Sequence, residues 1–572
     1  MRRSSTLLAA ASAAALLATG AAACSSSDSS NGSGSSAAFD PHNCQGGTLY
    51  VLNQSDATSH HLDPARIYTS GGGSITSLIF RTLTTRHRVP GQAGDQVVPD
   101  LATDTGKASD GAKTWTYHLK DGLKFDDGTP ITSRDIKWGV ERAFAPELPG
   151  GIPYLRDWLA GGADYKGPYK GKELDSIQTP DDKTIIFKLR KPEGDFPYVA
   201  TATQFAPVPK AKDDGTGYEK HPVSSGPYKV VSHEQDKSLV LARNPYWSRT
   251  LDDQRLACAD RVEGTYGLNA AVINQRLSSS AGKDANAITV DTDLSPAELA
   301  RISTDPNLKK RAVKGEFGET DYIAFDTKVK PFDDIRVREA ISYAIGRQSV
   351  VNAVGGSSLA KAATTFLPDQ AAFGYQPYDY FPAGPNGNAA KAKELLAQAG
   401  HPNGLTITLA HRNADYNHDG PAVATAIQSS LKQAGITVKL KPYDDAGYGD
   451  TVQKPSTEPG MFLATWGADW PTGGPFLAPI FDGRQILKDG GNFNASQLND
   501  SKVNTEFDAI NTITDPVQAR PRWGALDATI GRQALTVPLI HPIYIRLTGK
   551  NVKNAYLDEW RGSYDPAMVS VK

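Results

Sequence analysis

The pattern of apolar and polar positions changes character about halfway along the chain. In the first half, short runs such as 114–119 (TWTYHL) and 183–189 (KTIIFKL) alternate between apolar and polar residues, and this alternation predicts strands with one buried face. The runs 47–52 (GTLYVL) and 237–242 (KSLVLA) predict further strands. One helix with a Ser or Thr cap is predicted over 133–144. We therefore expect a β-rich first half.

From about residue 320, predicted helices alternate with predicted strands. Asp333 or Asp334 precedes a segment whose apolar positions recur every 3.6 residues, and Asn388 precedes another helix that ends at Gly400. A last apolar segment, 534–547, is expected to return to the first half of the fold. Alternation at this spacing predicts βαβ units and a mostly parallel sheet. The remaining elements are a helix over 421–434 and strands over 405–409, 436–440 and 461–466.

Length and composition narrow the classes of protein. The chain has 572 residues, too many for one core, so two or three domains are expected. The hydrophobic content is 39%, the charged content 22% and the net charge −2, which gives no attraction to nucleic acid. No phosphate loop, nucleophile elbow, zinc-protease motif or dinucleotide fingerprint occurs. We expect no catalytic residue, no cofactor and no metal site.

The N-terminus has the form of a secretory signal. Arg2 and Arg3 precede a Leu/Ala-rich run too short to span a bilayer, and the apolar segment ends at Cys24. This end resembles a bacterial lipobox, which predicts a signal peptide over 1–23 and lipidation of Cys24. The alternative is ordinary secretion with an incidental Cys. The Ser/Gly/Asn-rich segment that follows predicts a flexible tether over 24–43.

The chain has three cysteines, which suits an oxidising compartment. Cys24 is assigned to the lipobox, which leaves Cys44 and Cys258 as a candidate disulfide. The alternative is two buried or unpaired thiols. The absence of a Cys-x-x-Cys pair from the sequence rules out a cysteine zinc site.

Candidate binding residues follow two predicted strands of the second half. In open parallel sheets, ligands bind outside the carboxyl ends of the strands. Those ends carry His411 and, further on, Trp466, Asp469 and Trp470. A carboxylate between two indoles can receive a cation. The alternative is that both Trp side chains are core residues and Asp469 caps the next turn.

Four motifs in order along the chain carry a family resemblance. The motifs are 115–132 (WTYHLKDGLKFDDGTPIT), 225–230 (SGPYKV), 243–247 (RNPYW) and 331–340 (PFDDIRVREA). Together they resemble the extracytoplasmic peptide/nickel solute-binding family, family 5 of ABC-importer receptors, over nearly all of the chain after the signal segment.

This resemblance implies an α/β, two-lobed, periplasmic-binding-protein-like clamshell (type II, cluster C) with an extra domain inserted in the first lobe. The lobes would close around a ligand, and a monomer is expected. The implied boundaries are 44–75, 206–315 and 536–572 for lobe one, 76–205 for the inserted domain, and 316–535 for lobe two.

The resemblance also implies roles for individual residues. In peptide-binding members, the acidic residue of a Trp-x-x-Asp-aromatic stretch receives the peptide α-amino group, and Asp469 falls on that position. Tyr544 resembles an aromatic residue that borders the ligand cavity. Tyr68 and Gly72 fall where lobe one reaches the ligand.

The function implied is that of a lipid-anchored receptor on the outer face of the cell membrane. It would capture oligopeptides and deliver them to an ABC permease without breaking a bond. Alternatives are a receptor for a nickel chelate, an oligosaccharide or a siderophore-like compound, a cell-surface hydrolase, and a sensor that does not transport.

Overall fold

The computed structural model describes residues 39–571 except 43, 59–60 and 415–417. The predicted signal peptide 1–23 and the lipidation site Cys24 lie outside the described residues. Four sheets occur in the described part of the chain, with five, seven, two and four strands. No described helix combines the length and the apolar character needed to cross a membrane.

The five-stranded sheet has the order β11-β1-β10-β9-β8. β1 pairs in parallel with β10 and β11, whereas β8, β9 and β10 form an antiparallel meander. The strand predicted at this position is present as β1, and its alternate residues Leu49 and Val51 are buried in the core. The strands are β1 (Thr48–Leu52), β8 (Tyr228–Glu234), β9 (Ser238–Arg243), β10 (Arg261–Thr265) and β11 (Ala287–Ile288). The helices around this sheet are α1 (Ser70–Thr76), α5 (Ala270–Ser279), α6 (Pro296–Thr304) and α7 (Pro306–Lys309).

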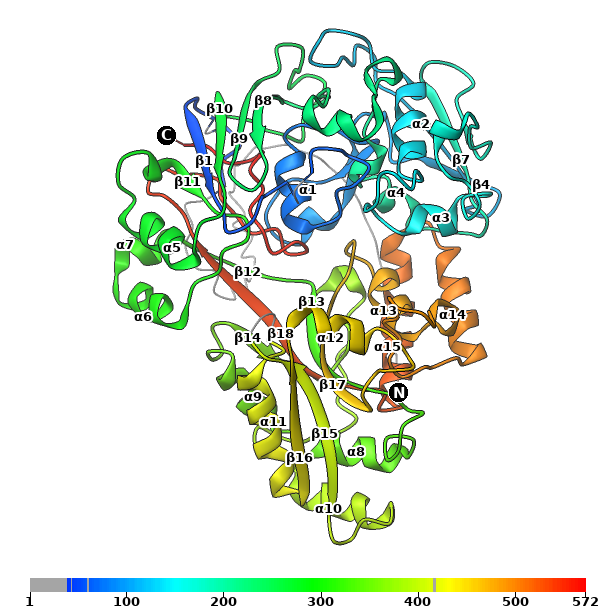
Figure 1. Ribbon diagram of the computed structural model, residues 1–572, viewed down its shortest axis with the longest axis vertical. Helices are drawn as coiled ribbons and strands as arrows, with labels where there is room; N and C mark the ends of the chain where they lie inside the picture. The colour runs from blue at the N-terminus through cyan, green and yellow to red at the C-terminus, as the bar shows by residue number, and fades with distance from the viewer. Residues whose placement is uncertain (1–38, 43, 59–60, 415–417, 572) are drawn as a thin grey trace, which may run out of the picture. The chain divides into compact units, whose positions relative to one another are not determined.

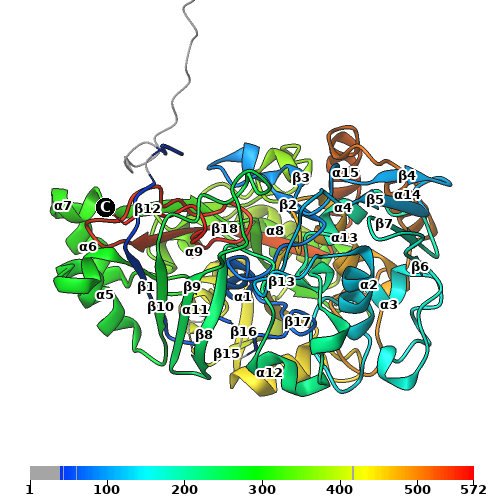
Figure 2. The same cartoon turned by 90° about the horizontal axis from the view of Figure 1, so that it is seen from above.

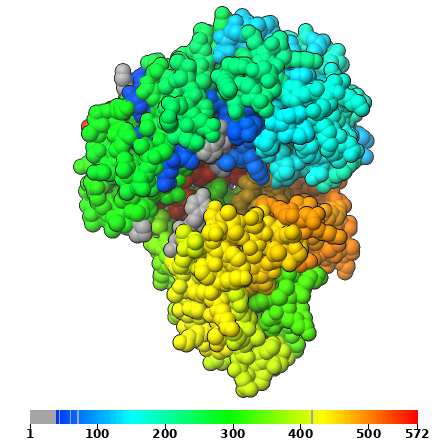
Figure 3. Space-filling view, in the orientation of Figure 1, coloured from blue at the N-terminus to red at the C-terminus, as the bar shows by residue number. Residues whose placement is uncertain are grey.

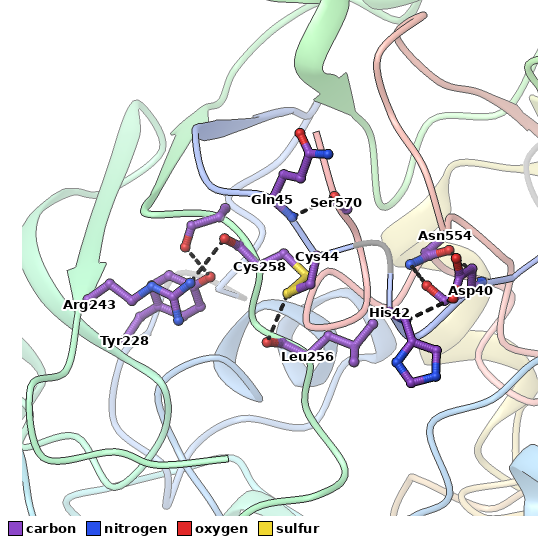
Figure 4. Close-up of a disulfide and its surroundings, with 11 residues drawn as sticks. Asp40, His42, Cys44, Gln45, Tyr228, Arg243, Leu256, Cys258, Asn554 and Ser570 are labelled. Atoms are coloured by element: carbon purple, nitrogen blue, oxygen red, sulfur yellow. Dashed lines mark hydrogen bonds between the residues drawn. A yellow bond between two sulfur atoms is a disulfide. The ribbon is translucent and has the colours of Figure 1, made fainter. Parts of the chain in front are cut away.

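A disulfide between Cys44 and Cys258 links the segments that lead into β1 and β10 (Figure 4). The Cα atoms of the two cysteines are 4.9 Å apart, although 214 positions separate them in sequence. Arg243 donates a hydrogen bond to the Cys258 carbonyl oxygen over 3.0 Å. The bridge therefore fixes the start of the first strand against the middle of the chain.

The four-stranded sheet has its own hydrophobic core. Its order is β4-β5-β7-β6, all antiparallel, and Trp115, Tyr117 and Phe187 pack against Ile136 and Val140 of α2. Its elements are β4 (Lys107–Ser109), β5 (Thr114–His118), α2 (Ser133–Arg142), α3 (Tyr154–Trp158), β6 (Ile177–Gln178), β7 (Thr184–Lys188) and α4 (Phe196–Val199). The two-stranded sheet, β2 (Thr84–Arg86) with β3 (Val97–Pro99), precedes it in sequence.

The seven-stranded sheet has the order β12-β18-β13-β17-β15-β16, and β14 also pairs with β18. Its strands are β12 (Ala312–Glu316), β13 (Glu319–Phe325), β14 (Ala360–Ala362), β15 (Leu405–Arg412), β16 (Ile436–Tyr443), β17 (Met461–Gly467) and β18 (Thr536–Leu547). The expectation of a mostly parallel sheet is wrong, because only β15 with β16 and β15 with β17 are parallel. Helices alternate with strands in the sequence only around those parallel strands. Strands β12, β13 and β18 pair antiparallel.

Two groups of helices flank this sheet. Asp334 caps α8 and Asn388 caps α10, as predicted, each through a side-chain oxygen that accepts a backbone N–H. Apolar residues of α8 (Ile335–Ala344), α9 (Arg347–Ala353), α10 (Ala389–Gln398) and α11 (Pro421–Gln433) form one core with the sheet. A second core includes residues of α12 (Asp445–Val452), α13 (Gly473–Phe481), α14 (Ser501–Asn511) and α15 (Pro516–Gly531).

Strand β18 connects distant parts of the fold. Residues 536–540 pair with β13 and residues 543–547 with β12, so the strand, red in Figures 1 and 2, runs from beside β17 toward α5. The segment after it packs into the core of the five-stranded sheet through Tyr564 and Val569. The return to the first half is therefore made mainly by the residues that follow the predicted 534–547 segment.

Candidate functional site

A cavity of about 330 Å³ lies where several distant segments meet. Figure 3 shows this face hollowed between the segments drawn in blue and those drawn in yellow. Tyr68 precedes α1, Arg86 ends β2, and Asp469 follows β17. Glu319 opens β13, and Arg561 lies in the C-terminal segment. The cavity thus brings together residues that are up to almost 500 positions apart.

Asp469 is held between two tyrosine hydroxyls. The Tyr68 hydroxyl donates to Oδ1 over 2.9 Å, and the Tyr154 hydroxyl of α3 donates to Oδ2. Burial raises the pKa of Asp469, and these two hydrogen bonds oppose that rise. Asp469 itself lines the cavity and is half-buried, so a ligand in the cavity can reach this carboxylate.

Trp470 anchors the loop that carries Asp469. Its side chain is 5% exposed, and its Nε1 donates to Asp195 Oδ2 over 2.8 Å. Its ring packs edge-on against Tyr154 and Trp158 of α3, with ring centroids 4.9 and 5.7 Å away. These contacts set the position of the neighbouring carboxylate, because α3 also supplies Tyr154.

One side of the cavity is basic. Arg88 pairs with Asp565 over 2.7 Å and Arg86 pairs with Asp558, whereas the Arg561 guanidinium has no hydrogen-bond or ion-pair partner among residues 39–571 as far as they are described. Burial and the neighbouring arginines lower the pKa of Arg86 to about 9 and that of Arg561 to about 10. A guanidinium that has no ion-pair contact with any described residue therefore faces the cavity.

Both Arg86 and Arg561 stack on one indole. Their guanidinium carbons lie 4.3 and 4.8 Å from the ring centroid of Trp560. Trp560 Nε1 in turn donates to the carbonyl oxygen of Ala468 over 2.6 Å. The basic side is thereby tied to the loop that presents Asp469.

Another side is acidic. Glu319 is 6% exposed and its Oε1 is buried, with no hydrogen-bond partner among the described residues. Its neighbour Asp321 accepts hydrogen bonds from Thr465 over 2.5 Å and from His418 over 3.0 Å. Burial and the charge of Asp321 raise the pKa of Glu319 well above its usual value. Burial lowers the pKa of His418, but the hydrogen bond and charge of Asp321 outweigh it and raise that pKa to about 9.

Three of the predicted ligand-binding residues, Tyr68, Asp469 and Trp470, line the cavity. The adjacent Gly73 lines it instead of Gly72, which is buried in α1. Of the described residues, four predicted ones are absent from its lining: Gly72, Trp466, Tyr544 and His411.

The other three predicted residues have different contacts. Trp466 Nε1 donates to the Pro475 carbonyl over 3.2 Å. Tyr544 packs edge-on against Phe317, which does line the cavity, at 5.5 Å between ring centroids. His411 is buried, with Nδ1 2.6 Å from the Arg412 carbonyl oxygen.

Sequence reasoning missed Tyr154, Glu319 and Arg561. Tyr154 lies more than 300 positions from its partner Asp469, and no local motif marks it. The only local signal for Glu319 is its place at the start of a buried strand that pairs with Gly467. Arg561 has no sequence signal, because its unpaired state depends on how Arg86 and Arg88 are compensated.

Comparisons with known proteins agree with this architecture. Residues 96–488 match the family model described as "Bacterial extracellular solute-binding proteins, family 5 Middle". The solved structure of clavulanic acid biosynthesis oligopeptide binding protein 2 matches with a TM-score of 0.86 and 35% identity, covering 92% of this chain and 96% of that chain. The predicted α/β two-lobed clamshell class is therefore confirmed.

Curated relatives match at lower identity. Heme-binding protein A of Haemophilus influenzae is 25% identical over 476 residues, covering 78% of this chain and 79% of that protein. Di/tripeptide-binding protein 1 of Pseudomonas aeruginosa is 26% identical over 445 residues, covering 73% and 75%. Each of these relatives is named as a binding protein and not as an enzyme.

Proposed function

The chain belongs to family 5 of the bacterial extracellular solute-binding proteins, and on this premise we propose that it captures oligopeptides outside the cytoplasm and delivers them to an ABC permease. The observation that carries the choice of peptide is the pair of opposite charges facing one cavity. Asp469 is a half-buried carboxylate, and Arg561 is a guanidinium without a counterion among the described residues.

Asp469 suits the α-ammonium group of a peptide. An ammonium that joined the two tyrosine hydroxyls would make a charge-assisted hydrogen bond, which is worth about 1.5–3 kcal/mol. The indole of Trp470 lies beside this carboxylate in sequence and lines the same cavity, and an aromatic face adds attraction for a cation.

Arg561 suits a peptide carboxylate. A planar guanidinium can bind a carboxylate through two parallel hydrogen bonds. Stacking on Trp560 orients the group, so less conformational entropy is lost when a ligand binds. Peptides carry both charges on every molecule, which neither a simple sugar nor an isolated cation does.

The proposed mechanism is closure of two lobes around the ligand. Tyr68 and Asp469 come from segments about 400 positions apart and form a hydrogen bond across the cavity. A ligand that contacts both sides stabilises the closed arrangement relative to the open one. The permease would recognise that closed surface, and a lipid on Cys24 would keep the receptor at the membrane.

Mass spectrometry of material released by unfolding the purified protein tests the proposal. We expect intact oligopeptides. Peptide fragments that appear only after incubation with the protein would instead identify a hydrolase. Recovery of a metal chelate, an oligosaccharide or a siderophore-like compound, with no binding of added peptides in calorimetry, would replace the proposed ligand class.

A further inference from the structure

Glu319 occupies a position that the proposed recognition of peptide termini does not use. It is the first residue of β13 and pairs with Gly467 of β17. Glu319 lines the cavity but is only 6% exposed. Its Oε1 accepts no hydrogen bond from any described residue.

The neighbouring carboxylates each have a cation. Asp321 contacts His418 at 3.0 Å, and Arg546 pairs with Asp293 over 3.0 Å. The remaining pair is Arg412 with Asp419, at 2.6 Å. Glu319 is the carboxylate of this group that has no ion-pair contact with any described residue. The charge of His418 acts on it, but the His418 ring contacts Asp321 instead. A buried carboxylate without a donor is costly unless it is protonated or meets a cation.

The space beside Glu319 is bounded by a glycine and an aromatic ring. A Cβ atom at Gly467 would lie 3.8 Å from Glu319 Oε2 and 3.7 Å from Phe317 Cζ. The absence of a side chain at 467 therefore leaves room beside both groups. A carboxylate next to an aromatic ring is a favourable environment for a planar cation.

We propose that Glu319 and Phe317 form a subsite for a cationic side chain of the bound peptide, with a guanidinium as the best-fitting group. This inference rests on the proposed peptide-binding function. It assigns the ligand a second positive group besides the α-ammonium at Asp469. The expected ligands are accordingly peptides that contain arginine or, with less complementarity, lysine.

Matched peptides test the subsite. Each position of a tri-alanine peptide is replaced in turn by arginine or by citrulline, its uncharged isostere, and binding is measured by calorimetry. At one position, the arginine peptide should bind the protein about 10- to 100-fold more tightly than its citrulline counterpart. Lysine and acetyl-lysine peptides form a second arm, which separates guanidinium from ammonium recognition.

Glu319→Gln should abolish this preference and leave the affinity for the citrulline peptide unchanged. Glu319→Asp keeps the carboxylate but places it farther from the cavity, because the side chain is one methylene shorter, so the preference for arginine should be smaller. Glu316→Gln is the matched control, because Glu316 pairs with Lys361 at 2.6 Å outside the cavity lining. It should retain the full preference.

The outcomes separate the subsite from the function itself. Binding of all the peptides with equal affinity by the wild type would overturn the subsite while leaving the peptide receptor intact. An arginine preference that survives in Glu319→Gln would also overturn it. Failure of every peptide to bind would instead overturn the proposed function, on which the subsite depends.

Discussion

Two carboxylates that line the cavity, Asp469 and Glu319, have opposite surroundings. Asp469 lies in a loop after β17 and accepts hydrogen bonds from two tyrosine hydroxyls. Glu319 lies at the start of β13, next to another carboxylate, and its Oε1 accepts none from the described residues. The described residues therefore donate hydrogen bonds to Asp469 but none to Oε1 of Glu319.

This difference determines how each group meets a ligand. At Asp469, hydrogen bonds from Tyr154 and Tyr68 oppose the effect of burial on the pKa, so part of the stabilisation of the ionised form is built in. At Glu319, burial and Asp321 raise the pKa, with His418 opposing them. A ligand cation would thus contribute more to ionising Glu319 than to ionising Asp469.

The largest predicted effect concerns His418, the cation next to Glu319. Its pKa is raised from 6.5 to about 9 by the hydrogen bond and charge of Asp321 and by Glu319 and Asp293, against the effect of burial. A raised pKa means that protonation stabilises the folded state. This contribution is complete below pH 6.5 and is lost as the pH rises to about 9.

We expect His418→Gln to remove up to about 3 kcal/mol of that pH-dependent stability. Urea unfolding between pH 6.5 and 9 measures it: the difference in free energy of unfolding between wild type and variant should be greatest at the acid end. His221→Gln, which removes an exposed His–Asp pair, should match the wild type. A constant difference across this range would contradict protonation of His418.

A smaller effect is expected at the other carboxylate. Asp469→Asn keeps the shape of the side chain but removes the charge, so free-amine peptides should bind about 1–3 kcal/mol more weakly. N-acetylated peptides should bind as before. Asp489→Asn, in an exposed loop, is the matched control, and calorimetry with both peptide classes is the measurement.

This experiment also tests the division of roles between the two carboxylates. If Glu319 received the α-ammonium group, Asp469→Asn would leave the discrimination between free and acetylated amines intact, and Glu319→Gln would remove it. Equal weakening of both peptide classes by Asp469→Asn would show a structural role for Asp469 instead.

Local sequence patterns predicted the elements better than their pairing. The caps at Asp334 and Asn388 and the helices that follow them agree with the structure, because a cap and an apolar period are set within one turn or two. The strand predicted over 405–409 continues to Arg412, because its parallel pairing with β16 extends to Tyr443. The pairing of β13 with β18 joins segments that are far apart in the sequence, so no local pattern indicated it.

The same limit applies to the cavity. Asp469 stands in a recognisable Trp-x-x-Asp stretch, so the sequence alone indicated it. Glu319 and Arg561 are notable only because neighbouring charges from other segments are already paired, as Asp321 is by His418. Which charges are paired depends on tertiary contacts, so it cannot be predicted from a single sequence.

The smallest predicted effect concerns the hydrogen bonds that Asp469 accepts and that Oε1 of Glu319 does not accept from the described residues. Tyr68→Phe removes one donor from Asp469 and leaves the cavity charge unchanged. Because that hydrogen bond lowers the pKa of Asp469, its loss should raise the pKa. Free-amine peptides should bind about 0.5–1.5 kcal/mol more weakly near neutral pH.

The pH dependence of binding in Tyr68→Phe should shift in one direction. A higher Asp469 pKa means that the carboxylate becomes protonated at a higher pH, so binding of free-amine peptides should be lost earlier as the solution is acidified. Tyr246→Phe is the matched control. Tyr246 is 46% exposed and Tyr68 is 47% exposed, but Tyr246 does not line the cavity. An unshifted acid limb in Tyr68→Phe would mean that the hydroxyl does not help to ionise Asp469, and the contrast with Glu319 would then rest on charge alone.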